Sequence, residues 1–140
     1  MIELEELKEA LREKEIWVLE EKRFGGEDAQ LLVKKRHHYI LQLITFNEVQ
    51  FFVFHCVYPT VADAVPLELV DMLNKELALI KVWRHWEHND TLLFTFYIVA
   101  SSPEAGAEGL LQFEELLKPA IEAVEKWEKE WWEQHKKKRG

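Results

Sequence analysis

Histidine is the residue type in this chain that most readily suggests a metal site, because six are present. His85 and His88 come nearest to a ligand spacing, but side chains alternate along a β-strand, so positions three apart point to opposite faces. The adjacent His37 and His38 meet the same obstacle, and no cysteine or carboxylate stands at a recognised zinc spacing to complete four ligands. We therefore predict no metal site and no cofactor, and interpret the histidines as solvated or strand-surface side chains.

Nucleophilic catalysis requires a nucleophile beside a base, and Cys56 next to His55 is the nearest approach to that arrangement. Neighbouring strand residues face apart, so we interpret Cys56 as a buried structural thiol. The glycines Gly25-Gly26 and Gly106/Gly109 fit neither a phosphate-binding loop nor a dinucleotide motif. Most carboxylates lie on the polar faces of predicted helices, and no pair stands out as acid and base. We therefore predict no catalytic residues and a protein that is not an enzyme.

Composition describes an acidic chain with enough apolar residues for a core. Of its 140 residues 48% are hydrophobic, with only 5 Gly and 4 Pro, which argues against disorder. The net charge is −8, and setting aside the basic tail of Lys136, Lys137, Lys138 and Arg139 leaves 14 of the 18 basic residues against 26 acidic ones. A body this acidic repels phosphate backbones, so we expect no nucleic-acid partner.

The single cysteine, Cys56, excludes a disulfide within the chain and suits a reducing compartment. The acidic N-terminus lacks the pattern of a signal peptide, and no run approaches the roughly 20 apolar residues of a membrane span. We therefore expect a cytoplasmic protein with no membrane partner. We also expect a single domain over residues 1–140, with the basic tail beginning at about residue 135.

Hydropathy patterns predict three helices, at about 2–14, 66–79 and 110–134, and strands at 16–19, 30–36, 39–46, 50–57, 80–86 and 92–99. Loops are expected at 24–28 and 101–109, and a kink or break at Pro119 inside the last helix. The apolar stripe of that helix is Phe113, Leu117, Ala120, Val124, Trp127 and Trp131. The order α-β-β-β-β-α-β-β-α predicts an α+β fold, a mostly antiparallel sheet of five to six strands with three helices packed on one face.

Aromatic residues are in surplus for such a core, since six tryptophans are present. The last predicted strand has Leu92, Phe94, Phe96 and Ile98 on one face and further apolar residues on the other, so both of its faces require cover. Trp83 and Trp86 are predicted to point to opposite faces of the strand before it. This pattern indicates a homodimer or a partner-binding surface, and the candidate surface residues are Phe51, Val53, Trp83, Trp86 and Trp132.

The helix at 66–77, the strand that follows and the hairpin with an Asn89-Asp90 turn resemble the YbjN-like proteins of the type III secretion chaperone-like superfamily. In that group a leucine-rich helix carries a Leu-Asn pair, which Leu73-Asn74 matches here. The resemblance covers 2–133 in element order and 66–100 in residue pattern, and it is closest to the group's uncharacterised cyanobacterial branch. It implies a small, non-enzymatic α+β protein, commonly a homodimer. Secretion chaperones of the superfamily bind an extended segment of another protein, whereas YbjN-like members are described as regulators. The long last helix and the basic tail depart from the pattern.

The leading hypothesis is a non-enzymatic protein-interaction module: a dimeric adaptor, chaperone-like or regulatory protein that binds an unknown partner by apolar contacts and by strand addition at a sheet edge. The alternative is a small ligand-binding domain or enzyme with a cleft between helices and sheet, whose groups converge only in space. A third hypothesis, binding of nucleic acid or membrane by the basic tail, is opposed by the ordinary role of cations at a helix C-terminus.

Overall fold

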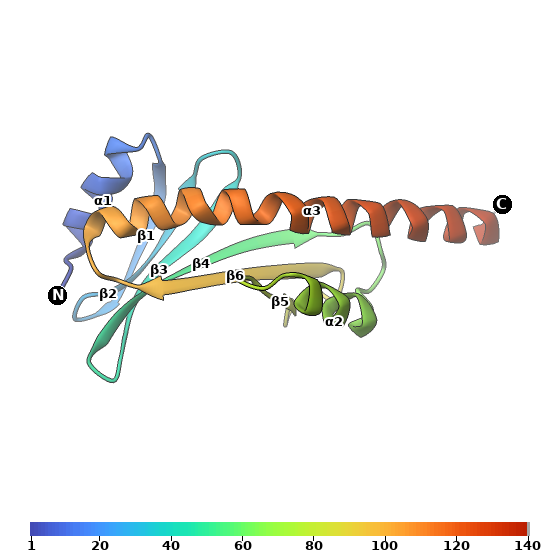
Figure 1. Cartoon of the computed structure of the whole chain (residues 1–140), viewed down its shortest axis with the longest axis horizontal. Helices are drawn as coiled ribbons and strands as arrows, with labels where there is room; N and C mark the ends of the chain where they lie inside the picture. Colours follow the sequence, from blue (N-terminus) through green and yellow to red (C-terminus); the bar gives the residue numbers. More distant parts are fainter. Residues whose placement is uncertain (140) are drawn as a thin grey trace. The chain divides into compact units, whose positions relative to one another are not determined.

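The computed structural model describes the backbone of residues 1–139 and the side chains of residues 1–136, and these residues form three helices and six strands (Figure 1). The elements are α1 (Leu4–Glu13), β1 (Trp17–Gly25), β2 (Asp28–Lys34), β3 (His38–Phe46), β4 (Val49–Pro59), α2 (Leu67–Glu76), β5 (Lys81–Arg84), β6 (Thr91–Val99) and α3 (Pro103–Arg139). The strands form an antiparallel open sheet in the order β1-β2-β3-β4-β6-β5. The predicted α+β class and element order are confirmed.

The chain divides into two compact units. Unit 1 contains Met1–Cys56 and Thr95–Glu115, and unit 2 contains Val57–Phe94 and the described residues from Leu116 onward. The strands β4 and β6 and the helix α3 contribute residues to both. Each unit is described by itself below.

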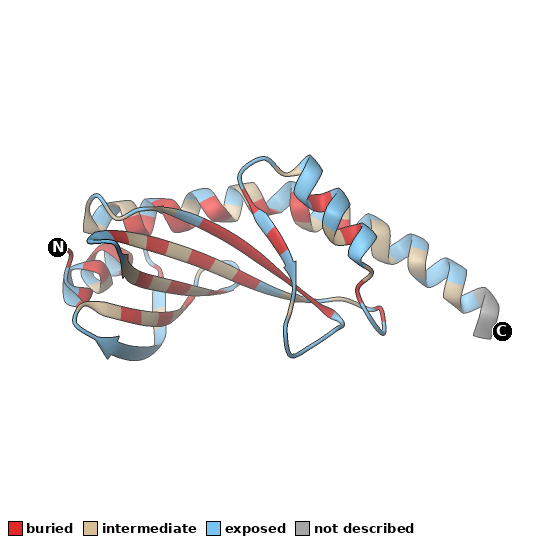
Figure 2. Ribbon diagram, turned by 90° about the horizontal axis from the view of Figure 1, so that it is seen from below, coloured by how far each residue is buried: buried red, intermediate tan, exposed pale blue. Residues whose placement is uncertain are grey.

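In unit 1, buried residues alternate with less buried ones along β2, β3 and β4 (Figure 2), which assigns them to two faces of the sheet. The inner face buries Leu31, Leu41 and Phe54. It is covered by α1, whose helical stripe of Leu4, Leu7, Ala10 and Leu11 is buried, and by the first turns of α3, where Phe113 contacts the rings of Tyr39, Phe54 and Phe96. The core of unit 1 therefore lies between one face of the sheet and these two helices.

The segment 101–109 is helix rather than the predicted loop from residue 103 onward. Pro103 suits the first helical turn, and the Ser102 hydroxyl accepts a hydrogen bond from the Ala105 N–H at 3.2 Å. Gly106 and Gly109 allow close packing, because an added Cβ at Gly109 would lie 2.8 Å from both Ile98 Cδ1 and Phe54 Cζ. The small residues therefore allow the helix to lie close to the sheet. The prediction of a loop was wrong because the glycines were interpreted as turn residues.

Two further boundaries differ from the predictions. β1 continues to Gly25, because it pairs with β2 through a turn in which Gly25 and Gly26 have φ of 128° and 55°, values that glycine tolerates. α3 runs through Pro119 without a break, so a break at that position was wrong. Of the predicted stripe on α3, the residues up to Val124 are buried, while Trp127 and Trp131 are half-buried.

In unit 2, α2 is attached to β5 by one side chain. The Asn74 amide donates to the Val82 carbonyl and accepts from the Val82 N–H, both at 2.8 Å. The chain leaves β5 after Arg84, so Trp86 lies in the loop that follows and not on the strand. The prediction that Trp83 and Trp86 sit on opposite faces of one strand was therefore wrong.

The C-terminal part of α3 is joined to the segment after β4 by Glu128. This carboxylate accepts hydrogen bonds from the Tyr58 hydroxyl at 2.7 Å and from the Val61 N–H at 2.9 Å. Burial and the neighbouring Glu128 carboxylate raise the pKa of Tyr58, so the phenol remains a donor. Among the described residues, no helix has the length and apolar character to cross a membrane.

Candidate functional site: the open face of unit 1

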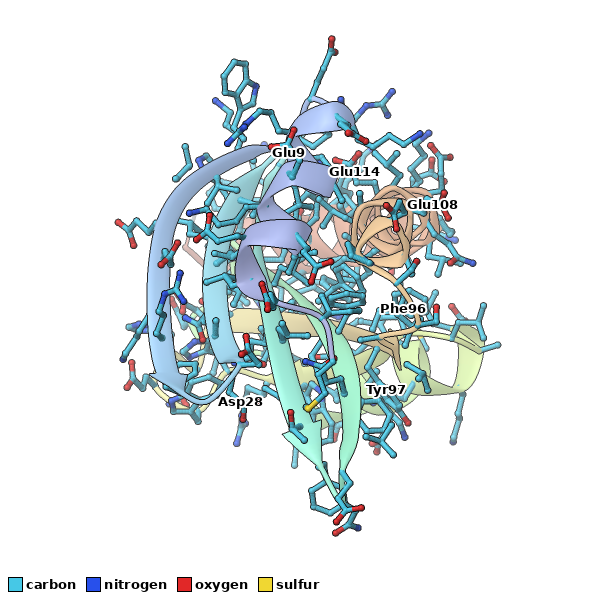
Figure 3. The ribbon with its side chains drawn as sticks, turned by 90° about the vertical axis from the view of Figure 1, so that its left-hand side faces the viewer. Glu9, Asp28, Phe96, Tyr97, Glu108 and Glu114 are labelled. Carbon is cyan, nitrogen blue, oxygen red and sulfur yellow. The ribbon has the colours of Figure 1, made fainter. Side chains whose placement is uncertain are left out.

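The outer face of the unit 1 sheet, opposite α1 and the first turns of α3, is covered by no helix of that unit among residues 1–139 (Figure 2). Phe96 and Tyr97 lie on opposite sides of β6, and Tyr97 belongs to this outer face (Figure 3). We call open face the outward residues Leu32, Ile40, Ile44, Phe51, Val53, Tyr97 and Val99, with the polar residues Gln30, Gln42, His55 and Thr95. None of these residues is formally charged when His55 is neutral, although the chain carries −8.

The polar residues of the open face bind one another in a row that crosses four strands. Gln42 Nε2 donates to Gln30 Oε1 at 3.0 Å, and Gln42 Oε1 lies 3.0 Å from His55 Nε2. His55 Nδ1 lies 2.9 Å from the Thr95 hydroxyl. With Gln42 Oε1 as acceptor, His55 Nε2 must carry the proton and Nδ1 accepts from Thr95. We call this row the polar seam.

Burial lowers the pKa of His55, which favours the neutral ring that the polar seam requires. Burying a polar group in an interface is costly when its hydrogen bonds to water are not replaced. In the polar seam both His55 nitrogens, the Gln42 amide oxygen, one Gln42 N–H, the Gln30 amide oxygen and the Thr95 hydroxyl already have a partner within the protein. The open face therefore combines apolar side chains with polar groups whose hydrogen bonds to one another can persist when a partner excludes water.

The two edges of the sheet are obstructed. β1 has irregular pairing between Val18 and Glu20 and again between Arg23 and Gly25. It also carries ion pairs to α1, with Lys8 2.8 Å from Glu21 and Arg23 3.0 Å from Glu5. At β5, the Asn74 amide occupies both backbone groups of Val82. Bulges, charges and covered backbone groups protect edge strands from pairing, so these features favour contact through the face.

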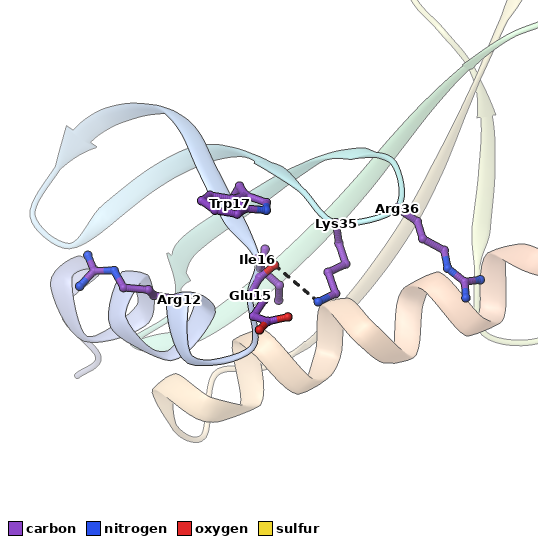
Figure 4. Close-up of a pocket in the computed structure, with 6 residues that line it drawn as sticks. All are labelled: Arg12, Glu15, Ile16, Trp17, Lys35 and Arg36. Atoms are coloured by element: carbon purple, nitrogen blue, oxygen red, sulfur yellow. Dashed lines mark hydrogen bonds between the residues drawn. The ribbon is translucent and has the colours of Figure 1, made fainter.

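A hollow of ≈ 560 Å³ lies beside Trp17 and is lined by Arg12, Glu15, Ile16, Lys35 and Arg36 (Figure 4). Its cations are partly engaged, because Lys35 Nζ donates to the carbonyls of Lys14 at 2.9 Å and Glu15 at 3.5 Å. Arg12 binds Glu9 at 2.7 Å. The hollow is one location for the alternative of a small-ligand site.

The predicted surface residues divide between the two units. Phe51 and Val53 lie together on the open face of unit 1, where both are half-buried. Trp83 on β5 is 52% exposed, Trp86 in the following loop 75% and Trp132 on α3 49%, and all three belong to unit 2. Each is thus accessible within its unit, but the tryptophans lie on different elements.

The histidine predictions have a mixed outcome. His85 and His88 do come together, with ring centroids 5.0 Å apart, because the chain has left the strand and His85 Nδ1 accepts the N–H groups of Glu87 and His88. The prediction that they point to opposite faces of a strand was wrong, because neither residue lies on one. His85 also stacks on Trp86 at 4.4 Å. Within the described part of the chain, no group of three His, Cys, Asp or Glu residues is arranged to hold a metal ion.

Cys56 lies on the inner face, 5% exposed, while His55 belongs to the open face. The predicted separation of thiol and imidazole is therefore confirmed. Burial raises the pKa of Cys56 to about 11, so the thiol is a poor nucleophile at neutral pH. The tail residues after Lys136 have side chains outside the described residues.

Sequence reasoning missed Gln30, Gln42 and Thr95. Each is an isolated polar residue at an outward position of an otherwise apolar strand, which is the only signal the sequence contains. Their connection depends on the pairing Gln30 with Gln42 and Ile40 with His55 across neighbouring strands. Periodicity within one strand does not specify that register.

No family model matches this chain, and no curated protein or solved structure shows significant similarity to it. The resemblance to YbjN-like proteins therefore stays a prediction.

Proposed function

We propose that this chain is a non-enzymatic protein-interaction module, a homodimeric adaptor of chaperone-like or regulatory kind, which binds a partner protein through the open face of unit 1. The observation that carries the proposal is the polar seam within an uncharged apolar face. Protein-binding surfaces have charge-depleted, aromatic centres surrounded by a polar rim. Here Phe51, Val53 and Tyr97 supply the apolar centre.

Size supports a role as the centre of an interface. Four strands about 4.8 Å apart, with two or three outward residues each at about 6.6 Å spacing, cover roughly 350–400 Å² of sheet face. A standard interface buries about 800 Å² on each partner. The open face would therefore form its centre, with charged neighbours such as Lys34 and Asp28 at the rim.

The preferred partner surface follows from the same chemistry. A face without formal charge does not attract a charged segment, so the partner is expected to offer apolar side chains and few ions. Trp83 and Trp86 are exposed enough to contribute a second contact from unit 2. Strand addition is less favoured, because both sheet edges are obstructed.

The test introduces a charge at the centre of the open face with Val53→Asp. Its matched control is Leu19→Asp, which makes the same kind of change at a 49% exposed residue of β1. Tagged forms are used to capture partners from a lysate of the source cells, with quantitative mass spectrometry. We expect the wild type and Leu19→Asp to retain the same protein, and Val53→Asp to lose at least about ten-fold of it.

Equal retention by Val53→Asp and the wild type would show that the open face is not the binding surface. Circular dichroism checks that each variant is folded. Trp83→Ala and Trp86→Ala, assayed in the same way, establish whether β5 and the loop that follows it take part. Light scattering over a dilution series measures the homodimer separately.

A further inference from the structure

The part of α3 in unit 2 contains three tryptophans that are not buried. Val124 is buried, and none of the residues 125–136 is. Trp127 and Trp131 are half-buried, and Trp132 is 49% exposed. Helices in proteins gain most of their stability from packing an apolar face. The tryptophans of this segment are therefore suited to pack against a further surface.

The spacing of these residues is that of a helix-pairing seam. Phe113, Leu117, Ala120 and Val124 alternate steps of four and three and are buried. Trp127, Trp131 and Gln134 continue the same alternation, which is the heptad pattern of paired helices. Trp132 lies outside this line. The seam that packs within the protein thus extends into a portion where no described residue is buried.

The ring of Trp131 packs against a neighbour on the same helix. The His135 ring stacks on Trp131 with centroids 4.0 Å apart, and His135 Nδ1 lies 2.8 Å from the Trp131 carbonyl, to which it donates. An aromatic side chain that is already ordered loses less conformational entropy on binding. Trp131 is therefore suited to anchor a contact.

The distribution of charge along this segment indicates that its binding partner is a second copy of the same segment. Residues 122–133 contain five glutamates and two lysines, whereas the next basic residues are Lys136, Lys137, Lys138 and Arg139. Two copies of this segment side by side in the same direction would place acid against acid and base against base. In opposite directions the acidic stretch of each copy faces the basic end of the other.

We propose that two copies of this chain pair antiparallel through residues 124–139 of α3, with Trp127 and Trp131 in the seam between them. This inference rests on the homodimer of the proposed function and specifies its surface. Matching the acidic stretch to the basic end places the two-fold axis near residues 132–133. The same patch on both copies then forms a closed, isologous interface.

The first test compares two tryptophans of one helix. Light scattering and sedimentation measure the dimer dissociation constant for the wild type, Trp131→Ala and Trp132→Ala. We expect Trp131→Ala to raise the constant at least about ten-fold and Trp132→Ala to change it less than about three-fold. Equal effects of the two variants, or no effect of either, would overturn the seam.

A charge exchange tests the direction while Trp127, Trp131 and Gln134 stay unchanged. One variant replaces Lys136, Lys137, Lys138 and Arg139 with glutamate, and a second replaces the exposed Glu122, Glu125, Glu130 and Glu133 with lysine. Each alone is expected to weaken the dimer at least about ten-fold at low salt, and both in one chain to restore it. Failure of the combined variant to restore pairing would contradict an antiparallel arrangement.

Distances between spin labels give a second readout of direction. With labels at Glu133→Cys the two copies are expected to lie close together, and at Glu122→Cys about 30 Å apart, from a rise of about 1.5 Å per residue on either side of the axis. Short distances at both positions would indicate parallel pairing and refute the proposal. The native Cys56 is buried, so it should not take the label.

These outcomes separate the two proposals. A wild-type dimer that is insensitive to Trp131→Ala and to the charge exchange would refute pairing through α3 while the homodimer stands. A monomer at every concentration would refute both the homodimer and its α3 surface. Binding of a partner by the open face is decided independently by Val53→Asp.

Discussion

Replacing Gly109 with alanine sets two opposing effects against each other. In an unhindered helix interior, alanine is more stable than glycine by about 1 kcal/mol. Burying the added methyl group would contribute roughly another 0.8 kcal/mol. On local grounds alone, Gly109→Ala should stabilise α3.

Packing reverses this expectation. The new Cβ would lie 2.8 Å from Ile98 Cδ1 and from Phe54 Cζ, whereas carbon atoms prefer about 3.5–4.0 Å. Phe54 is fully buried and contacts the rings of Phe96 and Phe113, so it has little freedom to move. Overpacking of this kind costs up to about 3 kcal/mol. We therefore expect a net loss of about 1 kcal/mol, or a fall in Tm of roughly 3–5 °C.

The assay is urea unfolding followed by circular dichroism, with the exposed neighbour Glu108 as the matched site. Alanine should be about 1 kcal/mol more stable than glycine at position 108 and about 1 kcal/mol less stable at position 109. If alanine were as favourable at 109 as at 108, the close packing of α3 on Phe54 and Ile98 would be refuted.

Three other consequences follow from single side chains. Folding lowers the pKa of His55, so below about pH 6.5 the unfolded chain binds more protons than the folded protein. The free energy of unfolding should therefore fall as the pH drops through that range, by at most about 1.4 kcal/mol per pH unit. His55→Gln should remove this contribution, and parallel curves for the two proteins would contradict it. Cys56, with a pKa raised to about 11, should react with a disulfide reagent at pH 8 at least about 100-fold more slowly in the folded than in the urea-unfolded protein; comparable rates would mean an accessible thiol. Asn74→Leu should lower the unfolding free energy by about 2 kcal/mol, since it leaves both backbone groups of Val82 without their partner, and thermal unfolding indistinguishable from the wild type would show that Asn74 does not hold β5.

Much of the secondary structure follows from local pattern. Alternation from Ala29 to Tyr58 and from Leu92 to Val99 predicts strands, and the stripe from Phe113 to Val124 predicts a buried helix, because burial on one face imposes a period of two or of 3.6. The errors occur where neighbours override local preference. The pattern around Gly106 and Gly109 predicts a loop, but in the structure these glycines let a helix pack closely on aromatic rings. The pattern around Trp86 predicts a strand, but in the structure the chain turns there, and His85 accepts a backbone N–H group of the turn.

The candidate site shows the same division more sharply. The sequence by itself determined that Phe51 and Val53 share a strand face, that Cys56 points away from His55, and that the acidic stretch of the last helix precedes a basic end. Only the tertiary structure decided that Gln30, Gln42, His55 and Thr95 bind one another, and that none of the residues 125–136 of α3 is buried. The physical reason is that side-chain direction is a property of one strand or helix, whereas strand register and the extent of cover depend on residues distant in the chain.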